Sequence, residues 1–213
     1  MGDAETSGTE GSGRTILELG DDYFFSLHGR VEFIVFEYRV ASLAWLRDRT
    51  LQSVESELAE VRATRTSGAH RVPGWEGESD LVLDEALAVL DEDTRQISAG
   101  VIVVAAAAAL ESLMNQMLNQ PSDTRFHRAG LARKADELAA RWQAAIDVTQ
   151  FLEDVAWLKK RRNAFAHRLI DDESGPTPVE AFGDDMAHEA LERTSAIAWM
   201  LEKGWEQHLT SQN

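Results

Sequence analysis

The sequence predicts an all-α protein, an antiparallel helical bundle preceded by an N-terminal helical extension. Apolar residues recur at intervals of three and four through most of the chain, which is the spacing of one face of a helix. Residues 97–118 are apolar on nearly all sides, as expected of a central helix that others cover. The four prolines fall between such segments. We therefore expect helices packed on helices.

The N-terminal third predicts a tail and an extension. Residues 1–14 lack a basic start and an apolar stretch, so we expect a flexible tail rather than a secretory signal. Residues 15–66 form the predicted N-terminal helical extension, either one long helix or a broken pair. Over residues 31–40 a strand is the alternative, because the residue types there also suit strands. Glycine, proline and serine then cluster in residues 66–77 and indicate a boundary.

Residues 79–213 are predicted to form the helical bundle. Ser79 or Asp80 can cap its first helix, which leads into the apolar central segment. A further helix is expected over residues 131–150, followed by a basic segment. Residues 171–178 read as a loop, and the last helix is expected from residue 184 to about residue 208.

Composition excludes several classes of function. The chain has 21 Lys and Arg against 37 Asp and Glu, a net charge of −16, which argues against a broadly basic nucleic-acid binder. The absence of cysteine excludes disulfides, thiolate nucleophiles and cysteine-ligated metals. The longest apolar run, residues 99–110, is too short to cross a bilayer. We expect a cytoplasmic globular protein that needs no metal or other cofactor and has no membrane partner.

Positive charge is concentrated in one segment. Between residues 159 and 168 there are five cations and no acid: Lys159, Lys160, Arg161, Arg162 and Arg168. Such a cluster can bind an anion, or it can simply complement a helix dipole while solvated. A looser group, Arg125, His127, Arg128, Arg133, Lys134 and Arg141, is interpreted as ordinary solvated helix surface.

The basic segment contains the residues that cleavage of RNA requires. Asn163 and His167 are four residues apart and share a helix face, and the long side chain of Arg162 can reach the same region. A histidine with a pKa near the usual value of about 6.5 can move a proton at neutral pH, and a guanidinium can bind phosphate oxygens. His167 would deprotonate the ribose 2′-OH, Arg162 would stabilise the phosphate, and Asn163 would orient one of them.

This pattern resembles the R-x4-6-H motif of the HEPN superfamily, compact helical-bundle proteins that include ribonuclease toxins and antiviral-defence effectors. The upstream helix, with Leu110 and Glu111 followed by Asn115, is similar to the small-residue-rich helix that often precedes the motif. The resemblance covers roughly residues 80–208. Arg65 and His70 also match the spacing, but glycine lies between them in a predicted loop, and we treat that match as incidental.

The resemblance implies a metal-independent endoribonuclease that acts on RNA as a homodimer, with a neutralising or regulatory protein as a further candidate partner. Catalytic roles are implied for Arg162, Asn163 and His167, and a supporting role for Glu111, whose alternative is to end an apolar face. Lys159, Lys160, Arg161 and Arg168 would bind substrate. Two alternatives remain: a non-catalytic module that binds RNA or protein, and a helical subunit whose alanine-rich and tryptophan-bearing faces only assemble with partners.

Overall fold

The computed structural model describes residues 14–168 and 181–211. These residues form helices and the segments that connect them. No strand occurs in this part of the chain, so the predicted all-α class is confirmed there. Nearly all of the predicted tail and the whole predicted loop over residues 171–178 lie outside the described residues.

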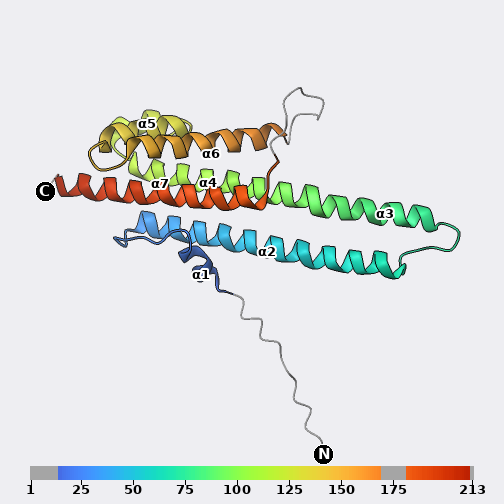
Figure 1. Ribbon diagram of the computed structural model, residues 1–213. Coiled ribbons are helices and arrows are strands. Elements are labelled where there is room, and N and C mark those ends of the chain that lie inside the picture. Colours follow the sequence, from blue (N-terminus) through green and yellow to red (C-terminus); the bar gives the residue numbers. More distant parts are fainter. Residues whose placement is uncertain (1–13, 169–180, 212–213) are drawn as a thin grey trace, which may run out of the picture.

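A long helical hairpin runs the length of the molecule (Figure 1). The short helix α1 (Ile16–Asp21) precedes α2 (Val31–Ser67), which lies antiparallel to a continuous helix made of α3 (Glu76–Ala88), the π-helical turn η1 (Val89–Thr94) and α4 (Arg95–Met117). Of the alternatives for the N-terminal extension, the broken pair is therefore correct, because the short α1 and the long α2 are separated by non-helical residues 22–30. The strand alternative over residues 31–40 is wrong, because apolar residues at helical spacing bury one side of α2.

The remaining helices pack on the half of this hairpin that contains α4 and the N-terminal part of α2, which we call its proximal half. They are the 3₁₀ turn η2 (Pro121–Phe126), α5 (Leu131–Trp142), α6 (Val148–Arg168) and α7 (Asp184–Ser211). The single helix predicted over residues 131–150 is wrong, since α5 and α6 are separate. The break has a local cause: the Asp147 carboxylate accepts a hydrogen bond from the Gln150 amide at 3.1 Å and so caps a new helix.

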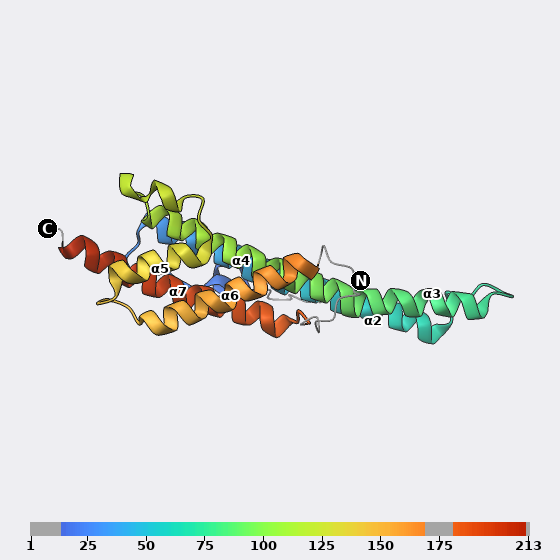
Figure 2. The same cartoon turned by 90° about the horizontal axis from the view of Figure 1, so that it is seen from above.

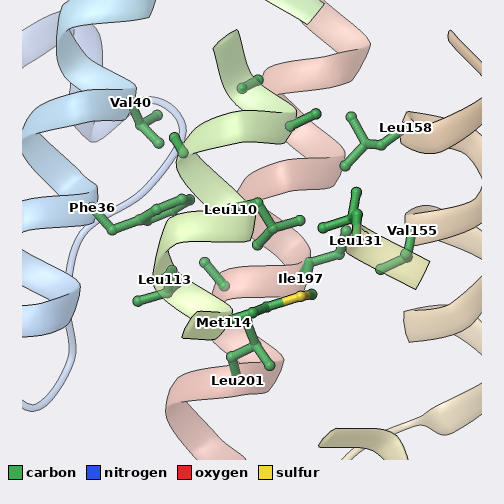
Figure 3. Close-up of a cluster of buried hydrophobic side chains, with 14 of the residues drawn as sticks. Phe36, Val40, Leu110, Leu113, Met114, Leu131, Val155, Leu158, Ile197 and Leu201 are labelled. Atoms are coloured by element: carbon green, nitrogen blue, oxygen red, sulfur yellow. The ribbon is translucent and has the colours of Figure 1, made fainter. Parts of the chain in front are cut away.

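Helix α4 is the centre of the core (Figure 3). Leu110, Leu113 and Met114 are completely buried, and they lie among side chains from α2, α5, α6 and α7. Those neighbours include Phe36 from α2 and Ile197 from α7. The helix from Glu76 to Met117 contains an 18-residue stretch of mean hydropathy 2.0, and 56% of that stretch is buried inside the protein. By length and composition alone this helix could also span a membrane, but neighbouring helices bury just over half of its apolar stretch.

The distal half of the hairpin projects beyond the other helices (Figure 2). We call residues 51–94 the arm and refer to α4 to α7 with the proximal half of α2 as the bundle. Val54 and Leu58, both on α2, are the only fully buried residues of the arm, whereas α3 and η1 contain none. The arm is therefore a two-helix projection with a thin apolar seam.

The start of α3 corrects a further prediction. The helix begins at Glu76, before the predicted caps, and neither Ser79 nor Asp80 caps it. The Ser79 hydroxyl donates instead to the Trp75 carbonyl at 2.8 Å. The Asp80 carboxylate accepts from Arg71 and also pairs with Arg65 and His70, at 2.9 and 2.8 Å. Arg65 and His70, which match the motif spacing by accident, are thus both paired with Asp80 near the tip of the arm.

Candidate functional site

Three helices of the bundle contribute one charged side chain each to a compact cluster. Glu111 of α4 accepts a hydrogen bond from Lys134 of α5, with 2.7 Å between Nζ and Oε1. The other carboxylate oxygen, Oε2, accepts from Nη1 of Arg162 on α6 at 3.2 Å. Glu111 and Arg162, both predicted as site residues, are therefore in direct contact, and the carboxylate bridges α5 and α6.

Burial explains why Glu111 is needed at this position. The side chain of Lys134 is only 1% exposed, and a buried ammonium is strongly unfavourable without a counter-charge. One carboxylate cannot neutralise two cations, so the cluster of Lys134, Glu111 and Arg162 has a net charge of +1. The interpretation of Lys134 as solvated surface is wrong, because the side chain turns inward to Glu111.

Arg162 retains capacity to bind an anion. Its side chain is 30% exposed. Only Nη1 is engaged with Glu111, and Nε and Nη2 make no hydrogen bond to any residue in the described ranges. A guanidinium held at one nitrogen has a restricted orientation but can still donate from the other two, which suits a phosphate.

The neighbouring Arg161 points elsewhere. Its guanidinium carbon lies 5.0 Å from the centre of the Trp157 ring, and that of Arg193 on α7 lies 5.1 Å from the same ring. Arg193 also pairs with Asp154 and Glu189, so this side of α6 is packed on α7. Both arginines fit the motif spacing, and the packing of α6 turns Arg162, not Arg161, toward Glu111.

The other predicted residues of the motif are on the surface of α6. Asn163 and His167 are exposed, one turn apart, near the C-terminal end of the helix. Five residues at about 100° each put His167 roughly 140° around the helix from Arg162. Within one chain, therefore, Arg162 and His167 leave the helix in different directions. Lys159 and Lys160 are exposed, and the side chain of Arg168 lies outside the described residues.

A close contact fixes the motif-bearing end of α6 on α4. Phe165 is buried and packs edge to face on Phe182, with ring centres 5.2 Å apart. Its ring lies directly over Gly100 of α4, where a Cβ atom would be 2.0 Å from two ring carbons. Only glycine permits this approach, so Gly100 determines how near the motif comes to α4.

Asn115 is a further polar residue near Glu111. It lies one helical turn after Glu111 on α4 and is partly buried. Its Oδ1 atom is buried and has no hydrogen-bond partner within the described ranges. The spacing of four residues on one helix is the signal that associates it with Glu111.

The main surface hollows are lined by other residues. In the alanine-rich segment of α4, Ala106, Ala107 and Ala109 are buried. Ala105 and Ala108 instead line an open hollow of about 670 Å³ between α2 and α4, with Tyr38 on its α2 side. Among the described residues, no group of three or more histidines and carboxylates could hold a metal ion.

The pairing of an acid on one helix with an arginine on another is a local arrangement, and such arrangements occur on unrelated folds. No protein-family model matches the sequence, and no curated protein or solved structure is similar to the chain at a significant level.

Proposed function

We propose that the chain is a HEPN-like, metal-independent endoribonuclease that acts as a toxin or an antiviral-defence effector. The observation that carries the proposal is the state of Arg162. This arginine is anchored at Nη1 by Glu111, is partly exposed, and retains two nitrogens for a phosphate. It belongs to a helix end that also bears the exposed Asn163 and His167.

The chemistry follows from the groups present. His167 accepts the proton of a ribose 2′-OH, and the freed oxygen attacks the adjacent phosphorus. Arg162 binds the non-bridging oxygens, on which negative charge accumulates in the transition state. The bond between phosphorus and the 5′-oxygen breaks, and the 5′-oxygen takes a proton from the imidazolium of His167. The products are a 2′,3′-cyclic phosphate and a 5′-hydroxyl.

Within one chain Arg162 and His167 point in different directions, and a homodimer can bring these two groups together. Because Arg162 and His167 leave α6 about 140° apart, the base from one subunit and the cation from the other would meet across a shared cleft. The open hollow between α2 and α4, lined by Ala105, Ala108 and Tyr38, is a surface on which a second subunit can pack closely. It lies on the helix that carries Glu111.

Charge distribution is compatible with a small RNA-binding site. The chain as a whole is acidic and repels extended nucleic acid. The cluster at Glu111 has a net charge of +1, and the exposed Lys159 and Lys160 are on the same helix as Arg162. Binding should therefore involve few phosphates and depend only moderately on salt.

The test is cleavage of a defined single-stranded RNA by the purified full chain in the presence of EDTA. We expect cyclic phosphate and 5′-hydroxyl ends, and no cleavage when the ribose at the cut site is 2′-deoxy. His167→Ala and Arg162→Ala should each lower the rate at least about a hundredfold, the usual contribution of one such group. Induced expression of the wild-type chain should arrest growth, and expression of His167→Ala should not.

His127→Ala is the matched control, because His127 is also exposed but lies outside the motif. It should cleave RNA at the wild-type rate. Absence of cleavage by the wild-type chain on every RNA tried, alone or with a partner, would refute the enzymatic proposal, as would equal losses in the His127 and His167 variants.

One observation favours a second candidate, a non-catalytic module that binds RNA or protein. Arg162 already has an acidic partner in Glu111, as expected of a residue whose role is to hold α6 on α4. In that case RNA would bind in a salt-dependent manner and remain uncut. Substitution of His167 would then leave binding and growth unchanged.

A further inference from the structure

The arm carries half of the net negative charge of the chain. Residues 51–94 contain eleven acidic residues and three arginines, a net charge of −8 out of −16. Arg62, Arg65 and Arg71 are each paired with an aspartate of the arm itself. Seven acids of the arm form no ion pair in the described ranges: Glu57, Glu60, Glu76, Glu78, Glu85, Glu92 and Asp93. The arm therefore presents uncompensated negative charge.

Apolar side chains are interleaved with these acids along the outward face of α3, which we take to include the preceding Trp75 and the residues of η1. Trp75, Val82 and Val89 are seven residues apart, and each is followed three residues later by a glutamate, at 78, 85 and 92. Residues at such intervals share one side of a helix. Trp75 and Val82 are 62% and 68% exposed, and Val89 is also exposed. This face is distinct from the inner one, where Leu83, Leu87 and Leu90 are partly buried.

Helix α3 lacks the packing that normally stabilises a helix of its length. It is 13 residues long and has no buried residue. It is held at one end by its continuation through η1 into α4, but most helical stability in proteins comes from burial of an apolar face, which α3 lacks. Helix α3 packs on the distal part of α2, whose buried residues there are Val54 and Leu58. A second apolar face left open on such a helix is typical of a docking surface.

Charge identifies the occupant. A second copy of this chain would bring −8 against −8 in a symmetric contact of two arms, which is repulsive at close range. A partner helix with lysines or arginines flanking an apolar stripe matches both features of the outward face. A hollow of about 350 Å³ near the tip, lined by His70, Glu78, Ser79, Val82 and Leu83, can receive one apolar side chain of such a helix.

We propose that the arm is a docking site for a cationic amphipathic helix of another protein, which packs along the outward face of α3. The apolar stripe of the partner covers Trp75, Val82 and Val89, and its basic residues pair with Glu78, Glu85 and Glu92. This interaction does not depend on the proposed nuclease activity, because it uses residues of α3 and η1, whereas Arg162 and His167 lie on α6 (Figures 1 and 2).

The probe is a three-heptad synthetic peptide of leucine and lysine that folds as an amphipathic helix, added to the full chain. Fluorescence anisotropy measures its affinity, and amide hydrogen exchange locates the contact. We expect saturable binding and slower exchange in α3. Replacing Glu78, Glu85 and Glu92 together with glutamine should weaken binding by about tenfold, from three surface ion pairs of ordinary strength. Val82→Ser with Val89→Ser should weaken it further.

The matched control replaces three exposed acids of the bundle that form no ion pair there, Asp136→Asn, Glu153→Gln and Asp185→Asn. This variant undergoes the same change in net charge and should bind the peptide like the wild type. Equal weakening in both triple variants, or equal affinity for a scrambled peptide of the same composition, would reduce the effect to nonspecific attraction and overturn the proposal. Self-association of the wild-type chain that Val82→Ser abolishes would overturn it in favour of a second copy.

Discussion

The arm and the bundle share one continuous helix, from Glu76 to Met117, but they are stabilised in different ways. In the bundle, Leu110, Leu113 and Met114 are completely buried among four other helices. In the arm a thin apolar seam at Val54 and Leu58 is accompanied by ion pairs between partly or fully exposed side chains, such as that of Arg65 with Asp84. Burial is insensitive to pH and salt, whereas exposed ion pairs depend on both. The difference suggests that the bundle maintains the fold, while the arm opens readily.

The largest expected effect comes from removing a core side chain of the bundle. Leu110→Ala should lower the free energy of unfolding by about 4 kcal/mol, since a buried leucine leaves a cavity between packed helices. Leu87→Ala in the arm should cost about 1 kcal/mol, because Leu87 is only partly buried and water can reach its site. Urea denaturation followed by circular dichroism measures both. Equal losses would contradict the division between arm and bundle.

Removing an ion pair should also cost more stability in the bundle than in the arm. Glu111→Gln should destabilise the protein by about 3 kcal/mol, because it leaves Lys134 buried without a counter-charge. Asp84→Asn in the arm should have little measurable effect, since Asp84 is exposed and Arg65 keeps a second acidic partner in Asp80. Adding Lys134→Met to Glu111→Gln should recover much of the loss. If it recovers none, the cost arises from Arg162 instead.

Glycine substitutions should also separate the regions, with smaller effects. Gly100→Ala should cost about 2 kcal/mol, because the new Cβ overlaps the Phe165 ring and pushes α6 away from α4. Gly77→Ala in α3 should be neutral or stabilising by about 0.5 kcal/mol, because a Cβ there meets no atom within 4 Å and alanine favours helix. Thermal unfolding measures both. A harmless Gly100→Ala would show that α6 is not fixed by this contact.

The sequence was sufficient to predict the helices that bury an apolar side in the core. The apolar spacing predicted α2, α4 and α7, because a helix that covers a core must repeat apolar residues every three to four positions. It missed the break between α5 and α6, since apolar residues continue through Ala145 and Ile146 and the decisive feature is the single cap at Asp147. It also misplaced the start of α3, where Ser79 bonds a carbonyl of the preceding turn.

Two members of the charged cluster, Glu111 and Arg162, were named from the sequence, but neither their contact nor the third member, Lys134, was predicted. Spacing fits both Arg161 and Arg162, and the sequence favours Arg162 only because Asn163 follows it. In the structure the rotation of α6 turns Arg162, not Arg161, toward Glu111. Burial of Lys134 could not be predicted from its surroundings in the sequence, because its partner Glu111 is 23 residues away on another helix. Long-range pairing of this kind depends on how α4 and α5 cross, which a local pattern does not encode.

The smallest effect concerns the response of the two regions to acid. The hydrogen bond from Arg71 and further contacts with His70 and Arg65 hold the pKa of the Asp80 carboxyl well below its usual range, and Arg65 lowers the pKa of Asp84. A carboxyl whose pKa is depressed by folding adds stability above its unfolded pKa of about 3.9 and loses it as pH falls toward the folded value. The arm should therefore loosen below about pH 4, while the core around α4 persists.

Hydrogen exchange protection factors, corrected for intrinsic rates, measure this order of opening. Between pH 7 and pH 3, protection in α3 should fall before protection in α4 does. Asp80→Asn provides the control, since it should show low protection in α3 already at pH 7 and a weaker dependence on pH. The bundle also contains a depressed carboxyl, Asp123 beside Arg141, but its helices retain buried apolar contacts when that group is protonated. Simultaneous loss of protection in α3 and α4 would mean that the arm and the bundle unfold as one cooperative unit.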